Sequence, residues 1–269
     1  MIRSTLGITQ EPFHNHRPEL MKHQKEVYDC IKIHAQQGGF CVVVGDSGVG
    51  KSVLRETIER LGEAPEAVVV SLSRTMHTHL NVLKQMAESF KIEVSVRDLE
   101  KDLIQAAFDC VRERVTLYTL IDEAHLLDMN VLRKLRLMFD RFPKRHNLVL
   151  IGERSLIHYL SMSNYEDIKN RVTYSSVSPG LCDDDLARFV LEELESVGLG
   201  ANTFDQSALD LIIRSVQGNL RLCRNLTYGS LLDACRQGKK IVTISHVNSV
   251  LVQPHWRSHE ELIQQQVAS

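Results

Sequence analysis

A run of eight residues carries the clearest chemical pattern in the chain, because it fits G-x-x-x-x-G-K-[ST] directly after an apolar stretch rich in valine. Glycines in such a loop let successive backbone N–H groups turn toward phosphate oxygens, and a following helix adds its positive end. Lys51 would then reach the β- and γ-phosphates of a nucleotide, and the Ser52 hydroxyl would hold Mg²⁺. The alternative is a glycine-rich turn that binds no ligand. The run consists of Gly45, Asp46, Ser47, Gly48, Val49, Gly50, Lys51 and Ser52.

An acidic pair, Asp122 and Glu123, follows a second apolar stretch, residues 116–121. An acid at the carboxyl end of a strand can reach Mg²⁺ on a nucleotide bound at the same edge of a sheet. Glu123 lies next to this acid without being taken up by the metal, so it is placed to orient and deprotonate an attacking water. The alternative is a pair of acids that caps the next helix. Together with the glycine-rich loop, the pair predicts nucleotide hydrolysis.

Three further charged residues occupy positions from which they could contact a nucleotide. Glu153 follows the apolar stretch 147–152, at the strand end where many ATPases carry a polar sensor of the γ-phosphate. Arg171 precedes the stretch 172–177, and in an oligomer it could reach the γ-phosphate held by a neighbouring subunit. Arg221 begins a helical segment after a glycine turn, from which it could reach back to nucleotide phosphates. The alternative for Arg171 is an ordinary surface arginine.

Short apolar stretches alternate with helical patterns over the first two thirds of the chain. Strands separated by helices of this length predict an α/β fold, with a parallel sheet of five strands and helices on its faces. The carboxyl ends of these strands would carry the glycine-rich loop and the acidic pair. The predicted strands end at or near residues 44, 72, 121, 152 and 177, and the predicted helices occupy 20–37, 53–62, 80–90, 99–110 and 129–143.

The pattern becomes all-helical after residue 179, which predicts a small helical lid domain behind the α/β domain. Residues before the first helix lack helical periodicity and hold one aromatic anchor, Phe13. The last residues hold the only tryptophan, Trp256, and form either a partner-binding extension or a surface helix. The predicted division is an N-terminal arm (1–20), a nucleotide-binding α/β domain (21–178), a helical lid (179–252) and a C-terminal tail (253–269).

Charge and cysteine content narrow the setting in which the chain works. It has 32 Lys+Arg against 34 Asp+Glu, a formal net charge of -2, so DNA binding would need a local patch or several subunits. A basic run within 129–143 is typical of a solvated helix face. The six cysteines form no C-x-x-C pair, which favours free thiols over a disulfide framework or a zinc site. With no signal segment and no apolar run of about 18 residues, we expect a cytoplasmic protein that does not enter a membrane.

The order of these motifs resembles that of an AAA+ ATPase. Its blocks are GDSGVGKS, LIDEAH, LVLIGE, NRV before the last strand and GNLRL in the helical lid. The opening LGITQEPF and the spacing of all five blocks are similar to the ExeA-like branch, which also includes transposition regulators of the TnsC, TniB and MuB/IstB kinds. The resemblance covers the two predicted folded domains.

This resemblance implies a role for individual residues. Arg171 matches the arginine finger that works in the site of a neighbouring subunit, and Arg221 matches the lid arginine that couples nucleotide state to lid angle. Glu153 departs from the Asn, Thr, Ser or Gln usual at the sensor position, and a carboxylate there would repel a γ-phosphate. The positions that bind ATP and Mg²⁺ and activate water are matched by Lys51, Ser52, Asp122 and Glu123.

The first function that the resemblance implies is the control of DNA transposition. Such a protein assembles with ATP as a ring or helical filament on double-stranded DNA, recruits or activates a transposase, and disassembles after hydrolysis. A few basic residues per subunit would add up along the duplex phosphates, nearly independently of base sequence. The candidate DNA contacts are Arg74, His77, Arg97 and Lys101, each of which could equally be a solvated charge.

Two other functions remain open at this stage. The first is a secretion-system assembly ATPase of the ExeA kind, which we expect to continue into a membrane span and a cell-wall-binding domain. The 269 residues contain neither, which favours transposition. The second is a helicase-loader-like AAA+ protein whose partner is a replication protein.

Overall fold

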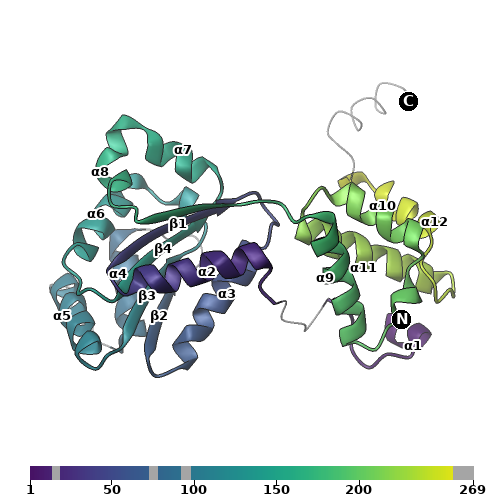
Figure 1. Ribbon diagram of the computed structural model, residues 1–269, viewed down its shortest axis with the longest axis horizontal. Coiled ribbons are helices and arrows are strands. Elements are labelled where there is room, and N and C mark those ends of the chain that lie inside the picture. The colour runs from purple at the N-terminus through teal and green to yellow at the C-terminus, as the bar shows by residue number, and fades with distance from the viewer. Residues whose placement is uncertain (14–18, 73–77, 92–97, 257–269) are drawn as a thin grey trace. The chain divides into compact units, whose positions relative to one another are not determined.

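The computed structural model describes residues 1–13, 19–72, 78–91 and 98–256 of the chain (Figure 1). The chain divides into two compact units. Glu19–Pro179 forms the first, called the α/β unit below. Met1–Pro18 and Gly180–Ser269 form the second, called the helical unit.

A five-stranded sheet with strand order β2-β3-β4-β1-β5 forms the centre of the α/β unit, and all of its strand pairs are parallel. Every residue of β1, β3 and β4 is buried, which explains why their sequences are largely apolar and do not alternate regularly with polar residues. The predicted α/β fold with a parallel sheet is therefore confirmed. The strands are β1 (Gly39–Gly45), β2 (Ala67–Leu72), β3 (Thr116–Ile121), β4 (His146–Gly152) and β5 (Tyr174–Ser178).

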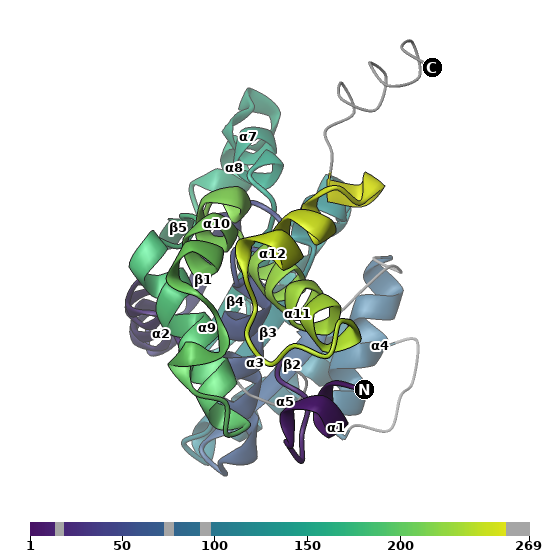
Figure 2. The same cartoon turned by 90° about the vertical axis from the view of Figure 1, so that its right-hand side faces the viewer.

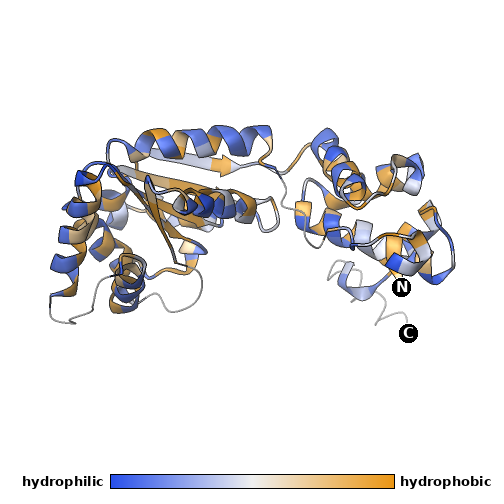
Figure 3. Ribbon diagram, turned by 90° about the horizontal axis from the view of Figure 1, so that it is seen from below, coloured by the Kyte–Doolittle hydropathy of each residue, from blue (hydrophilic) through white to orange (hydrophobic). Residues whose placement is uncertain are grey.

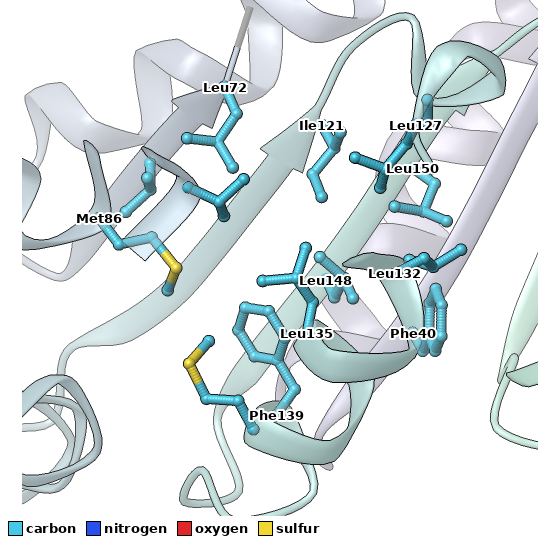
Figure 4. Packing of buried hydrophobic residues seen from close by; sticks show 14 of the residues in the cluster. Phe40, Leu72, Met86, Ile121, Leu127, Leu132, Leu135, Phe139, Leu148 and Leu150 are labelled. Atoms are coloured by element: carbon cyan, nitrogen blue, oxygen red, sulfur yellow. The ribbon is translucent and has the colours of Figure 1, made fainter. Parts of the chain in front are cut away.

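Helices cover both faces of this sheet, and each face has its own core because successive strand residues point to opposite sides. Val42 and Val44 of β1 pack with α4, α5 and α6, in the core whose side chains Figure 4 shows. Cys41 and Val43 pack on the other face with α2 and α3. The helices are α2 (Lys22–Ala35), α3 (Lys51–Glu59), α4 (His79–Ser89), α5 (Leu99–Arg112) and α6 (Met129–Phe139).

Several helices begin at polar caps that the sequence encodes. The side chain of Thr78 accepts a hydrogen bond from the Asn81 N–H at the start of α4, and Asp128 accepts one from the Asn130 N–H at the start of α6. The helix predicted at 129–143 ends earlier, at Phe139. Two short helices that periodicity did not predict, α7 (Ser155–Ser161) and α8 (Glu166–Lys169), lie between β4 and β5.

The helical unit contains α9 (Asp183–Ser196), α10 (Gln206–Val216), α11 (Leu220–Arg236) and α12 (Ile244–Leu251), which Figure 2 shows in front. A further helix, α1 (Ile2–Leu6), lies against α11, although the first residues lack helical periodicity. Phe13 is buried and its ring packs against Phe189 at 5.9 Å between centroids. Its backbone N–H donates to Glu193 at 3.1 Å. The start of the chain is thus part of this unit.

Hydropathy follows the layers of each unit, since the apolar residues gather on the sides of helices and strands that face other elements (Figure 3). None of the helices in the described part of the chain is both long and apolar enough to cross a bilayer. All six cysteines belong to the described residues and are free thiols.

Candidate nucleotide-binding site

The glycine-rich loop joins the carboxyl end of β1 to the start of α3, as the sequence predicts. Gly48 and Gly50 have φ of 84° and 92°, in the left-handed region that favours glycine, and Gly50 caps α3. A Cβ on Gly45 would lie 3.0 Å from the backbone oxygen of Ser178. The loop therefore needs glycine at these three positions to hold its curled path.

Lys51 closes the loop, because its Nζ donates to the carbonyl oxygens of Gly45 and Asp46, both at 2.8 Å. Burial lowers the pKa of the Lys51 ammonium from its ordinary value. The carboxylates that oppose this shift belong to Glu123, Glu153, Asp122 and Asp46. A partly buried ammonium surrounded by acids and held by carbonyls is suited to exchange those carbonyls for phosphate oxygens.

The ends of three strands bring the predicted acids to the loop. β4 lies between β1 and β3, and the register pairs Val44 with Gly152 and Ile121 with Leu150. Asp122 and Glu123 directly follow β3, and Glu153 directly follows β4. All of these residues therefore lie at the same edge of the sheet as the loop, where open α/β sheets bind ligands.

Asp122 is held by two donors of the protein. Its Oδ2 accepts from Arg55 Nη1 at 2.7 Å, and its Oδ1 accepts from the Glu123 N–H at 2.9 Å. Arg55 lies on α3, one turn after Ser52, so the ion pair ties the helix to the end of β3. The oxygens of Ser52 and Asp122 are the hard donors that Mg²⁺ prefers, at the two positions that flank the loop.

Glu123 has an unusual backbone and an unusual neighbour. Its φ is 52°, a left-handed conformation that costs energy for a residue other than glycine and is frequent at functional sites. The imidazole of His125 lies between Glu123 and Glu153, with Nδ1 3.6 Å from Glu123 Oε2 and Nε2 3.8 Å from Glu153 Oε2. The Glu153 N–H donates to Nδ1 at 3.3 Å. These three side chains form one connected group.

Sequence reasoning missed three residues that shape the site: Gln24, Arg55 and His125. The buried Gln24 of α2 donates from Nε2 to the Gly50 carbonyl at 3.2 Å, which supports the loop from behind. A helical turn separates Arg55 from Ser52, so helix periodicity alone could have directed it to the site. His125 stands two residues after Glu123, but only the fold reveals that it also meets Glu153.

Arg171 lies at the amino-terminal ends of the strands, whereas the loop of the same chain lies at their carboxyl ends. The next residue but one, Thr173, donates its N–H to Phe40 near the start of β1, whereas the loop follows the end of β1. The 7-residue strand separates these edges by roughly 20 Å, at about 3.3 Å per residue. Arg171 lines a cavity of about 470 Å³ there, with its Nη2 3.5 Å from Asp140 Oδ2. Within one chain, the structure does not bring Arg171 to the other site residues.

Arg221 lies in the helical unit, in the first turn of α11. The turn before it is well defined, since Asn219 caps the helix by accepting from the Leu222 N–H at 3.0 Å. Gly218 has a φ of 80°, and its carbonyl accepts from the Leu181 N–H. Arg221 is exposed on this capped helix start.

The predicted DNA contacts are described only in part. Lys101 is exposed on α5, while Arg74, His77 and Arg97 lie outside the described residues. Three arginines of the basic run, two on α6 and one shortly after it, form ion pairs within the chain. Arg133 and Arg136 pair with Asp167, at 3.1 Å and 3.5 Å, and Arg141 pairs with Glu100 at 3.2 Å. These pairs support the interpretation of that helix as a solvated face.

Comparison with known families matches residues 33–160 to the AAA domain. Among curated protein sequences, none matches the chain. The matched segment contains the loop, both acids and His125. It is similar to an AAA domain, and the five-stranded parallel sheet with its flanking helices has the AAA+ fold.

Solved structures agree on the fold. The ORC2 protein of Aeropyrum pernix, in ADPNP and ADP complexes, is 14% identical over 89% of this chain and 70% of that chain, with a TM-score of 0.69. Drosophila ORC bound to DNA is 18% identical over 96% of this chain and 66% of that chain, with a TM-score of 0.66. The RuvB Holliday junction branch migration motor of Thermotoga maritima is 15% identical over 89% and 72%, with a TM-score of 0.56.

Proposed function

We propose that the chain is an ATPase whose site is formed by the glycine-rich loop and the ends of β1, β3 and β4. The observation that carries this proposal is the convergence of Lys51, Asp122 and Glu123 at one edge of the sheet. The loop N–H groups and Lys51 bind the phosphates, and Ser52 and Asp122 hold Mg²⁺. Glu123 accepts a proton from the attacking water. Bound Mg²⁺ would neutralise charge on the β- and γ-phosphate oxygens.

The ATPase works as a homo-oligomer in this proposal, because Arg171, the residue matched to the arginine finger, does not reach the loop of its own chain. Arg171 lies roughly 20 Å from its own loop and is half exposed, as suits a group that serves another subunit. In that subunit it would stabilise charge on the transferred phosphoryl group. Arg221, from the helical unit, would contact the phosphates and link the nucleotide to the position of that unit. Glu153 is the residue at the sensor position.

The proposed role of the oligomer is the ATP-dependent regulation of DNA transposition in the cytoplasm. It rests on the motif order shared with transposition regulators and on the AAA+ fold, which Drosophila ORC bound to DNA also has. The net charge of -2 is compatible with DNA binding if each subunit adds a few phosphate contacts, Lys101 among them. A transposase is then the protein partner. A helicase-loader-like role with a replication protein as partner is the second candidate, and the AAA+ fold is compatible with both roles.

Electron microscopy with a slowly hydrolysed ATP analogue tests this proposal, with and without duplex DNA. We expect rings or filaments that depend on both ligands, and none with Lys51→Ala. Assembly that is indifferent to DNA would contradict the role on DNA. ATP-bound assemblies that stimulate strand transfer by a transposase would support transposition, whereas loading of a ring helicase would support the second candidate.

A further inference from the structure

His125 is the only imidazole among the described residues that lies between two carboxylates of the site. Its side chain is 12% exposed, while those of Glu123 and Glu153 are 48% and 50% exposed. The imidazole ring is therefore largely covered, whereas the two carboxylates beside it reach solvent.

The orientation of the ring follows from its contacts with Glu153. The backbone N–H of Glu153 donates to Nδ1 at 3.3 Å, so this nitrogen is an acceptor and the hydrogen of the neutral ring resides on Nε2. Nε2 in turn lies 3.8 Å from the Glu153 carboxylate. The hydrogen bond from the Glu153 N–H thus selects the tautomer of the imidazole, and the carboxylate of the same residue lies near the other ring nitrogen.

The backbone around the ring is built for this close contact. A Cβ on Gly152 would lie 3.1 Å from the backbone nitrogen of His125 and 3.4 Å from Nδ1, so a larger residue at the end of β4 would displace the ring. Glu123 reaches Nδ1 from a left-handed backbone with a φ of 52°. The close packing at Gly152 and the left-handed backbone of Glu123 therefore both favour the contact between Glu123, His125 and Glu153.

We propose that His125 is a positioning residue that sets the place of the Glu123 carboxylate and is itself oriented by Glu153. This inference rests on the proposed ATPase function and deepens it. It also gives Glu153 a part that does not require contact with the γ-phosphate, from which a carboxylate would be repelled. Glu153 influences hydrolysis through the imidazole. Nδ1 accepts from the Glu153 N–H and lies 3.6 Å from Glu123 Oε2, so the ring limits how closely this carboxylate can approach and thereby bounds its position.

Steady-state hydrolysis by four variants tests the proposal: His125→Ala, His125→Asn, Glu153→Gln and the double variant His125→Ala/Glu153→Gln. Misplacing a reacting group by about 1 Å can cost up to about 100-fold, so we expect His125→Ala to lower kcat by about 10- to 100-fold. KM should change by less than about twofold, because binding groups remain. His125→Asn keeps an acceptor near the Nδ1 position and should recover part of the loss. The kcat of the double variant should lie within about threefold of the kcat of the slower single variant, because both substitutions act through one path.

The controls separate this role from a merely structural one. His158→Ala removes an exposed imidazole of α7 in the same unit and should leave kcat unchanged. Glu153→Gln alters a half-exposed carboxylate, so it tests the path even if His125→Ala does not fold. In ¹⁵N-histidine NMR spectra, His125 should show a protonated Nε2 and an acceptor Nδ1, and Glu153→Gln should shift its signals.

The possible results separate the positioning role of His125 from the proposed ATPase function. Wild-type turnover by folded His125→Ala, multiplicative losses in the double variant, or a protonated Nδ1 in the neutral ring would overturn the positioning role and leave the ATPase intact. A wild-type chain that binds ATP but never hydrolyses it, in any assembly state, would overturn the proposed function and this role with it.

Discussion

At the scale of residues, the polar side chains of the site are hydrogen-bonded to other groups of the protein. A nucleotide that binds would exchange some of these partners. Lys51 donates to two loop carbonyls, and Asp122 accepts from Arg55 and from the Glu123 N–H. Such contacts satisfy polar groups that are partly covered by the protein. They also hold the side chains close to the positions that phosphate binding needs, so less ordering remains to be done on binding.

The first prediction concerns Lys51. Lys51→Ala removes the charged donor from the loop and leaves phosphate charge without its partner, so ATP affinity should fall by at least about 30-fold. Titration with a fluorescent ATP analogue measures this loss. Lys84→Ala, an exposed lysine of α4, is the matched control and should bind as the wild type does. Undiminished affinity of Lys51→Ala would show that the phosphates bind elsewhere.

At the scale of elements, the ion pair between Arg55 and Asp122 joins α3 to the end of β3. Both side chains are largely covered, at 22% and 16% exposed, and the atoms are 2.7 Å apart. Arg55→Ala would leave the Asp122 carboxylate without its charged donor, so the free energy of unfolding should fall by about 1 to 2 kcal/mol. Urea denaturation measures this change.

A second ion pair on a helix provides the control for Arg55. Arg112 and Asp109 of α5 are 3.0 Å apart, but their side chains are 74% and 53% exposed. Arg112→Ala should therefore cost less than about 0.5 kcal/mol, because solvent screens the pair. Equal losses in the two variants would show that the contact of Arg55 has no special structural weight.

The buried His146, at the start of β4, predicts a dependence of stability on pH. Burial lowers the pKa of its imidazole below the ordinary 6.5, against the opposing effects of the Pro143 carbonyl and Asp140. As the pH falls below about 6.5, the unfolded chain takes up a proton that the folded chain refuses, so folding loses up to about 1.4 kcal/mol per pH unit from this group. The loss ends only where the pH passes the folded pKa.

Urea denaturation between pH 7.5 and pH 5 checks this expectation. In His146→Phe, the part of the pH dependence due to this imidazole should disappear, while the hydrophobic stacking on Phe139 is kept. His158→Gln changes an exposed histidine and should leave the dependence as it is in the wild type. A wild-type pH dependence in His146→Phe would refute the assignment.

Most elements could be predicted from the sequence, for physical reasons. Largely apolar stretches such as 67–72 and 147–152 predict strands of a sheet covered by helices. The partly buried β2 and the fully buried β4 follow these stretches closely. Short helices such as α1 and α7 have too few turns for a periodic pattern to be distinctive. Their positions depend on packing that involves distant parts of the chain.

The candidate site was predictable only where local spacing encodes it. Lys51 and Ser52 follow from one contiguous motif, and Asp122 from its place at the end of a strand. His125 and Gln24 owe their positions to contacts with Glu153 and Gly50, which are 28 and 26 residues away. Such contacts arise from the strand order of the sheet, which a single sequence does not encode in any local pattern.

At the scale of the whole molecule, each chain places Arg171, the proposed arginine finger, at the opposite end of the strands from the glycine-rich loop. Arg171 precedes β5, so two chains would be needed to bring Arg171 of one to Lys51 of the other. Our proposal is therefore that the ATP site is completed between subunits. It predicts that Arg171 and Glu123 are contributed to one shared site by different subunits, so that loss of either one prevents hydrolysis there.

Mixing two inactive variants measures this claim most directly. Glu123→Gln should bind ATP without hydrolysing it, and Arg171→Ala should be similarly slow, since a finger arginine contributes about 10³- to 10⁵-fold to turnover. In a mixture, some sites pair the intact Glu123 of one subunit with the intact Arg171 of the other. We therefore predict that ATP hydrolysis reappears on mixing and is greatest near equal amounts of the two variants. Hydrolysis that stays at the sum of the separate variants at every ratio would contradict a site shared between subunits.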